Sequence, residues 1–211
     1  MSGRFPARAT GYALKRAIDI VGASVGLLLC IPIFLLVGIA LKQEGGSVFF
    51  AHHRVGRRGR VFPCYKLRTM LPDAQSRLDA YLASHPEARE EWARDFKLRD
   101  DPRVTKLGQF LRRSSLDELP QLWNVLIGDM SLVGPRPVVE AELERYGQHV
   151  QAYLAMRPGI TGLWQVSGRN DTGYEQRVAL DAQYVREWSV WLDCVILVRT
   201  VEVVLMRRGA Y

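Results

Sequence analysis

An uncharged segment near the N-terminus constrains this chain more than any other feature. Residues 20–41 contain no charged side chain and are rich in Leu, Ile and Val. A helix of this length is long enough to cross the hydrocarbon core of a bilayer. The stretch is longer than the core of a cleavable signal peptide, and no small-x-small cleavage site follows Leu41. The segment therefore predicts a membrane-associated protein.

The charges around this segment leave its topology open. Pro32 lies in its middle, where it removes a helical hydrogen bond and favours a helix–break–helix hairpin that enters and leaves on one face. A proline-kinked spanning helix fits the same residues. Asp19, at the entrance, is expected to pair with Lys15 or Arg16. Basic residues on both sides, which attract both ends to the cytoplasm, are Arg4, Arg8, Lys15 and Arg16 before the segment and Lys42, Arg54, Arg57, Arg58 and Arg60 after it.

Composition narrows the class of protein. The 211 residues of the whole chain, 48% of them hydrophobic, are enough for one sizeable domain and argue against disorder. The three cysteines, Cys30, Cys64 and Cys194, are odd in number and far apart, which argues against a disulfide framework and fits a reducing compartment. The net charge of +7 predicts an anionic partner: nucleic acid, phospholipid or a phosphorylated substrate.

The segments that follow the apolar stretch predict a small sheet and a helical insert. Residues 47–50 and 61–67 are β-branched or aromatic and are separated by the polar stretch 52–60, which predicts a β-hairpin. Residues 72–99 turn to Ala, Glu, Arg and Leu, which predicts a solvated helical insert broken near His85.

The second half of the chain predicts further helices. Two of them are expected at 105–113 and 116–126, ending near Gly128. The tail, residues 184–206, has a helical period with charged interruptions, so it suits either an interfacial helix or a core helix.

An adjacent pair of acids, Asp117 and Glu118, is the most unusual local feature. Ser115 and Glu118 have the spacing of a capping box, which would make Glu118 a helix cap and Asp117 a first-turn carboxylate. Pro120 stands close behind, and it predicts a distorted helix start.

Arginines in loops around this acid pair indicate phosphate chemistry. Guanidinium groups held on Gly- and Pro-containing loops suit bidentate binding of phosphate oxygens, although each arginine taken alone is more typical of an ion pair with a surface acid. The acid pair could hold a divalent cation against a diphosphate. The arginines concerned are Arg112 and Arg113 upstream, Arg136 in 134–137, Arg157 in 157–159 and Arg169 in 167–169. Phosphate-binding P-loops, dinucleotide-binding glycine motifs, D-x-D pairs and H-E-x-x-H motifs do not occur.

Four blocks in this order resemble one protein family. They are residues 65–70, 115–121, 128–137 and 157–169, and the likeness runs from 15–19 to the C-terminal 209–211. The chain resembles the small monotopic type of bacterial polyprenyl-phosphate sugar-1-phosphate transferases. The resemblance implies transfer of a sugar 1-phosphate from a UDP-sugar to undecaprenyl phosphate, giving a polyprenyl diphosphate sugar and UMP.

The resemblance also implies roles for individual residues. Asp117 matches the nucleophile and magnesium ligand of the family, and Glu118 is its partner. Lys66, Arg112 and Arg136 match basic residues that bind phosphate and substrate. Arg157, Gln165 and Arg169 lie in matched loops and are further candidates for substrate binding.

An expected architecture follows from the residues and the resemblance together. We expect an α+β, mainly helical, monotopic membrane protein at the cytoplasmic face of the bacterial inner membrane. Residues 1–45 would form a re-entrant helical hairpin, with Ile31 before Pro32 where some relatives have Ser. Residues 46–211 would form the catalytic domain, with a small β-hairpin, the helical insert 72–99 and an interfacial amphipathic helix at 184–206.

Substrates and rival functions complete the expectation. The insert, residues 140–142 and the ending 208–211 resemble exopolysaccharide-initiating members that use UDP-galactose or UDP-glucose. Mg²⁺, polyprenyl phosphate and membrane phospholipid are the expected cofactor and partners, nucleic acid is not expected, and a homo-oligomer is left open. One rival is a basic, membrane-anchored binding module without turnover. The other is a phosphohydrolase that uses the Asp117 nucleophile with water as acceptor.

Overall fold

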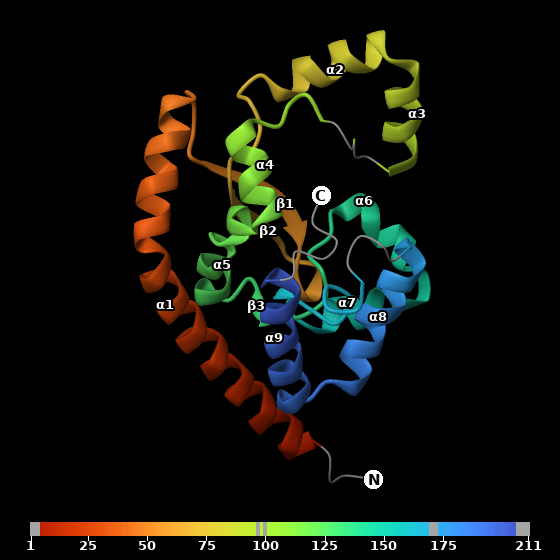
Figure 1. Cartoon of the computed structure of the whole chain (residues 1–211). Coiled ribbons are helices and arrows are strands. Elements are labelled where there is room, and N and C mark those ends of the chain that lie inside the picture. Colours follow the sequence, from red (N-terminus) through yellow and green to blue (C-terminus); the bar gives the residue numbers. More distant parts are fainter. Residues whose placement is uncertain (1–4, 96–97, 99–100, 169–172, 206–211) are drawn as a thin grey trace.

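The computed structural model describes residues 5–95, 98, 101–168 and 173–205. One long helix, α1 (Phe5–Gln43), runs along one side of a mixed α/β globular part, and two short helices project from the end of the molecule at which α1 finishes (Figure 1). The described chain is mainly helical with two small sheets, as the α+β expectation requires.

Helix α1 is a single continuous helix of 39 residues that contains Pro32, so the chain does not turn back at this proline. The expected helix–break–helix hairpin is thus absent from the described structure. Both halves of α1 pack against the globular part, through Ala23 and Cys30 in one cluster and Leu41 in another. This packing offsets the one hydrogen bond that proline removes. In the described part of the chain, α1 is the one helix long and apolar enough, by length and composition, to cross a membrane.

The expected β-hairpin is confirmed with a longer first strand. Strand β1 (Phe49–Val55) pairs antiparallel with β2 (Val61–Leu67). The prediction that residues 52–55 belong to the loop is wrong. The polar side chains at 52–54 fit β1 because this strand is half of a two-stranded sheet and most of its residues are exposed. A tight turn over Arg57–Gly59 joins the strands.

The helical insert and the next helices follow the expectation closely. Helices α2 (Ala74–Ser84) and α3 (Pro86–Asp95) are separated at His85. Helix α4 (Lys106–Arg113) begins at Thr105, whose hydroxyl accepts a hydrogen bond from the Gly108 N–H. Helix α5 (Gln121–Ile127) ends at Gly128, which adopts the left-handed conformation that terminates helices.

A second sheet, which the sequence did not predict, joins two of the Gly- and Pro-rich loops. Strand β3 (Ser131–Val133) pairs in parallel with β4 (Gly159–Thr161). The connection between them contains α6 (Glu140–Leu143), a 3-10 segment (Glu144–His149) and α7 (Val150–Ala155). Each strand leads directly into a loop that holds a candidate site residue.

The tail forms two helices rather than the single helix expected at 184–206. Helix α8 (Tyr174–Glu187) and helix α9 (Val190–Leu205) are separated by Trp188 and Ser189. The hydroxyl of Tyr184 in α8 donates a 2.6 Å hydrogen bond to Asp193 in α9, and both side chains are buried. This bond can form only if α9 folds back on α8. The tertiary contact therefore divides a segment whose sequence period predicts one continuous helix.

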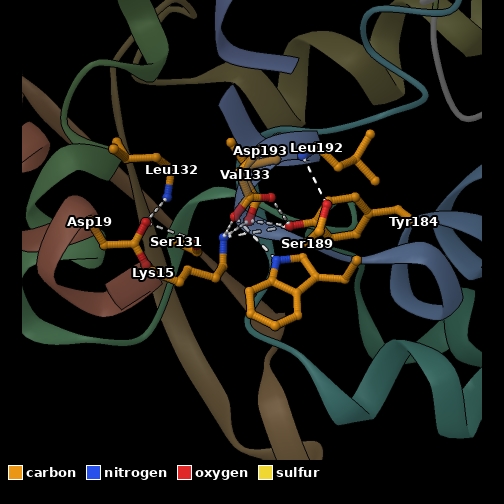
Figure 2. Close-up of polar contacts among 10 residues, drawn as sticks. Lys15, Asp19, Ser131, Leu132, Val133, Tyr184, Ser189, Leu192 and Asp193 are labelled. Atoms are coloured by element: carbon orange, nitrogen blue, oxygen red, sulfur yellow. Dashed lines mark hydrogen bonds and ion pairs between the residues drawn. The ribbon is translucent and has the colours of Figure 1, made fainter. Parts of the chain in front are cut away.

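Buried charges fasten the beginning of α1 to the globular part (Figure 2). We call Lys15, Asp19, Ser131 and Asp193 the α1 clamp. The Lys15 ammonium lies 2.7 Å from the Asp193 carboxylate and donates to the Val133 carbonyl at 2.8 Å. Asp19 accepts hydrogen bonds of 2.9 Å from the Ser131 hydroxyl and the Leu132 N–H. The expected pairing of Asp19 with Lys15 or Arg16 is therefore wrong, because both cations have partners in the globular part.

Removal of the clamp cation should destabilise the fold. Lys15→Met leaves the buried Asp193 carboxylate without its counter-ion, so we expect a loss of about 3 kcal/mol in the free energy of unfolding. Thermal unfolding in detergent measures the change. Arg77→Ala, which breaks the exposed ion pair with Asp73, is the control and should leave the melting temperature unchanged. Equal melting temperatures for the two variants would contradict a stabilising clamp.

Candidate active site

The acid pair lies at a sharp corner between α4 and α5. Ser115 adopts a left-handed conformation with φ +56°, and residues Leu116–Glu118 form a single 3-10 turn. The Ser115 side chain makes no cap hydrogen bond, so the expected capping box is wrong. The reason is that α4 ends only two residues earlier, and the backbone must reverse at Ser115 before α5 begins. Pro120 is the residue before α5, in agreement with the expected distortion of this helix start.

Strand β2 brings Lys66 to both acids. The Lys66 ammonium lies 2.6 Å from Glu118 Oε1 and 3.7 Å from Asp117 Oδ2. Asp117 is 7% exposed, whereas the side chains of Lys66 and Glu118 are partly open to solvent. Glu118 is thus an ion-pair partner of Lys66 rather than a helix cap.

The protonation states of Asp117 and Lys66 follow from their burial and from the charged side chains beside them. The pKa of Asp117 is raised to about 6, mainly by burial and also by the neighbouring Glu118 carboxylate, whereas the charges of Lys66 and Arg112 limit the rise. Burial alone would lower the pKa of Lys66, but the carboxylates of Glu118 and then Asp117 raise it above its usual value. Lys66 therefore stays charged at neutral pH, where it offsets the charge of the acid pair.

Arg112 joins the same group from the last turn of α4. Its Nε donates a 2.9 Å hydrogen bond to the Thr69 hydroxyl, and its positive charge acts on Asp117. Close packing of α4 on this segment depends on Gly108, because a Cβ at that position would overlap the Thr69 carbonyl. The structure therefore brings together four predicted residues, namely Lys66, Arg112, Asp117 and Glu118.

Arg136 lies in the loop that follows β3, and its charge acts on Cys64 of β2. Its guanidinium lies over the Trp164 ring, 5.3 Å from the centroid. Burial raises the pKa of the Cys64 thiol to about 11, and the positive charges of Lys66 and Arg136 both act against this rise. Cys64 and Lys66 are two residues apart on one strand, so their side chains share a face. Arg136 therefore contributes positive charge to the face of β2 that carries Lys66.

Arg157 does not join this group. Its Nε donates a 2.7 Å hydrogen bond to the Gly128 carbonyl, at the end of α5. Arg16 of α1 binds the neighbouring carbonyls of Val125 and Leu126 at 2.6 and 2.8 Å. The C-terminal carbonyls of a helix attract cations, so both arginines act as caps here. Asp117 lies beyond the opposite end of the same helix.

The remaining candidates lie in the loop after β4. Gln165 is partly buried, and its Oε1 has no hydrogen-bond partner among the described residues. The buried Nε1 of Trp164 is likewise without a partner in the described part of the chain. Arg169 lies outside the described residues.

The sequence analysis missed three residues that shape this region. Trp164 lies within the block 157–169. Arg136 contacts its ring, and the guanidinium of Arg177 lies 5.0 Å from the ring centroid. Arg177 belongs to α8, where no motif marks it. Thr69 holds Arg112, and its place in the block 65–70 was the available signal.

The donor set at the acid pair suits Mg²⁺ in part. No group of three or more His, Cys, Asp or Glu side chains that could hold a metal occurs among the residues described. Mg²⁺ is commonly held by one or two carboxylates, with substrate phosphates and water as its other ligands. Asp117 and Glu118 supply two adjacent carboxylates, so they fit this mode of binding and not a cage made by protein alone.

The contact of Arg157 predicts a structural role. Arg157→Ala should cost about 1–2 kcal/mol of stability, because the Gly128 carbonyl loses a charge-assisted hydrogen bond. The KM for the UDP-sugar expected from the resemblance should change by less than about threefold. Thermal unfolding and steady-state kinetics measure the two effects. A large rise in KM with an unchanged melting temperature would instead place Arg157 on the substrate.

Comparison with known proteins identifies the family. Residues 10–207 match the family model described as bacterial sugar transferase. The chain is 52% identical over 205 residues to the undecaprenyl-phosphate galactose phosphotransferase of Salmonella typhimurium, which covers 97% of this chain and 43% of that protein. It is 53% identical over 198 residues to the UDP-galactose-lipid carrier transferase of Erwinia amylovora, covering 94% of this chain and 42% of that one.

A third relative matches in length as well. The exopolysaccharide production protein ExoY of Rhizobium meliloti is 51% identical over 205 residues, covering 97% of this chain and 91% of ExoY. The chain thus spans less than half of the Salmonella and Erwinia proteins and nearly all of ExoY. With a family model that matches it almost from end to end, this chain belongs to the bacterial sugar transferase family.

Proposed function

We propose that this protein transfers galactose 1-phosphate from UDP-galactose to undecaprenyl phosphate and releases UMP, as the first membrane step of exopolysaccharide synthesis. The observation that carries the proposal is the cluster of Asp117, Glu118, Lys66 and Arg112 in a member of this family. Galactose is chosen over glucose because two relatives that are 52% and 53% identical over the aligned residues carry galactose in their names.

The proposed reaction is a double displacement at phosphorus. The Asp117 carboxylate attacks the phosphorus that bears the sugar, and the bond from this phosphorus to the oxygen shared with the UMP phosphate breaks. UMP leaves with the electron pair of that bond. A phosphate oxygen of undecaprenyl phosphate then attacks the same phosphorus, which frees the Asp117 carboxylate and gives the undecaprenyl diphosphate sugar.

The surrounding charges support the use of a weak nucleophile. A carboxylate approaches a diphosphate only if the negative charge at phosphorus is offset. Lys66 lies within reach of both acids, and Arg112 is fixed beside them by Thr69. Bound Mg²⁺, held by Asp117 and Glu118, would supply further neutralisation of the diphosphate oxygens.

Arg136 is proposed to bind the phosphate groups of the nucleotide sugar. Its guanidinium offers a planar fork of donors, which suits phosphate oxygens better than an ammonium does. The Trp164 ring supports one face of this group. Gln165, whose Oε1 lacks a partner among the described residues, is the second candidate from the same region.

We further propose that the protein is monotopic on the cytoplasmic face of the inner membrane. The α1 clamp holds one end of α1 against β3 and α9, and Leu41 near the other end is buried with Leu67 and Leu111. Two ends that contact one globular part cannot lie on opposite sides of a bilayer. In the re-entrant form of this proposal, α1 bends at Pro32 when its centre enters the leaflet.

The surface of the two long helices supports this placement. Exposed apolar side chains run along α1, where Leu36 is 72% exposed, and recur on α9, where Trp191 is 76% exposed. Ile196 of α9 is buried, so α9 has one face in the core and another at the surface. This arrangement reconciles the two alternatives for the tail, since an interfacial helix can also contribute to a core. Figure 1 shows α9 beside the first half of α1.

Topology can be tested by cysteine labelling. With the exposed Cys194 changed to Ser and the buried Cys30 and Cys64 left in place, a cysteine added at position 8 or at position 42 should react only from the cytoplasmic side. Labelling of intact cells and inverted vesicles with a membrane-impermeant reagent distinguishes the sides. Pro32→Leu should shift molecules towards a spanning helix and lower activity, because leucine restores the helical hydrogen bond whose loss allows α1 to bend. Periplasmic labelling of either site would exclude the monotopic arrangement.

The covalent step predicts a trapped intermediate. Incubation of the protein with UDP-galactose and Mg²⁺, without lipid, should release at most about one equivalent of UMP in a burst. The peptide that contains Asp117 should gain the mass of one hexose phosphate after rapid acid quench. UDP-glucose in a parallel reaction tests the choice of sugar.

Two variants separate the roles of the acids. Asp117→Asn should abolish both the burst and the adduct, whereas Glu118→Gln should retain a slow burst. Release of UMP only when undecaprenyl phosphate is present, with no adduct, would contradict the covalent step and favour direct attack by the lipid phosphate. Continuous release of galactose 1-phosphate without lipid would instead indicate a phosphohydrolase.

A further inference from the structure

The loop that carries Arg136 is held by an unusual set of hydrogen bonds. It consists of residues 134–138, and its two prolines, Pro135 and Pro137, have no N–H to donate. The Gly134 N–H donates to the Thr161 carbonyl of β4 at 2.9 Å, as a continuation of the sheet. The other two N–H groups of the loop donate to side chains of distant segments. The conformation of the loop therefore depends on residues outside the four sequence blocks that resemble the family.

Asp181 of α8 accepts the hydrogen bond from Arg136 itself. The Arg136 N–H donates to Asp181 Oδ2 at 3.3 Å, and the Tyr146 hydroxyl donates to the same oxygen at 2.8 Å. Asp181 is 2% exposed, and its Oδ1 has no partner among the described residues. A buried carboxylate with one oxygen that lacks a hydrogen bond lowers the stability of the fold. Its presence beside this loop therefore indicates a role other than stability.

Tyr153 of α7 holds the other end of the loop. The Val138 N–H donates to the Tyr153 hydroxyl at 3.2 Å, and that hydroxyl donates to the Val55 carbonyl of β1. The Val138 carbonyl in turn accepts a 2.8 Å hydrogen bond from the Val55 N–H. The end of the loop is therefore tied to the first sheet, whereas the Arg136 backbone has Asp181 as its contact.

We propose that Asp181 is a positioning residue, which fixes the backbone at Arg136 so that the guanidinium lies over Trp164 and faces the phosphate groups of the substrate. The proposal rests on the function proposed above for Arg136. Asp181 is buried and contacts Arg136 through the main chain, so its effect on the reaction passes through Arg136. The Asp181 carboxylate and the Arg136 charge also attract each other: burial raises the pKa of Asp181 to about 7, and Arg136 acts to lower it.

A double-mutant cycle tests this dependence. Asp181→Leu removes the acceptor, and kcat/KM should fall by at least about tenfold. Asp181→Asn keeps an oxygen that can accept from both donors, and it should retain activity within about threefold of wild type. Arg136→Lys should lose about tenfold by itself, because the lysine cannot form a fork. In the Arg136→Lys background, Asp181→Leu should cost less than about threefold more.

A core variant controls for loss of stability alone. Ile196→Ala removes a side chain of α9 that is 1% exposed and makes none of the loop hydrogen bonds. Whatever loss of activity it causes should be the same in the wild-type and Arg136→Lys backgrounds. If Asp181→Leu behaves in the same way, so that its full loss multiplies with that of Arg136→Lys, the positioning role is refuted.

Hydrogen exchange tests the loop without any reference to turnover. The Arg136 amide should exchange at least about tenfold faster in Asp181→Leu than in wild type, and at nearly the wild-type rate in Asp181→Asn. Unchanged exchange in Asp181→Leu would overturn the proposal. If wild-type protein releases no UMP from any UDP-sugar, the proposed function fails, but the exchange rates still decide whether Asp181 holds the loop.

Discussion

Lys15 carries a full charge into the interior, where its ammonium lies 2.7 Å from Asp193 and 2.8 Å from the Val133 carbonyl. A buried charge is tolerated only with such partners, so α1, β3 and α9 can pack only in the one arrangement that supplies them. Asp19 adds a second attachment one turn further along α1. Because Val133 immediately precedes the loop of Arg136, the same interaction that seats the apolar helix also fixes the strand from which this loop departs.

The loops that follow β3 and β4 place Arg136 against Trp164. Parallel pairing of β3 and β4 places the loops that follow them next to each other, and this is why Arg136 and Trp164 meet although they are far apart in the sequence. Asp181 then accepts a hydrogen bond from the Arg136 N–H of this loop. The acid pair, Asp117 and Glu118, is positioned by a different part of the chain. It arises at the corner between α4 and α5, where the left-handed Ser115 turns the acid pair towards Lys66 of β2.

These two halves have different physical requirements. The acid pair depends on charge balance, since Asp117 is buried next to another carboxylate and is tolerated because Lys66 and Arg112 lie beside it. The loop of Arg136 depends on hydrogen bonding by its few available N–H groups, since two of its five residues are prolines. In the function proposed above, Arg136 and the acid pair act on the same diphosphate, and the exposed apolar face of α1 contacts the membrane that holds the acceptor lipid.

The sequence by itself determined the apolar helix, the β-hairpin, the helices around the insert and the identity of the acid pair. These features depend on local patterns, namely a run without charges, alternation, caps and adjacent residues. Tertiary structure alone decided the partners: Asp19 binds β3 instead of the basic pair beside it, Glu118 binds Lys66 instead of capping a helix, and Arg157 binds the end of α5. A buried charge takes the partner that the packing of distant segments brings to it, and no spacing along the chain encodes that choice.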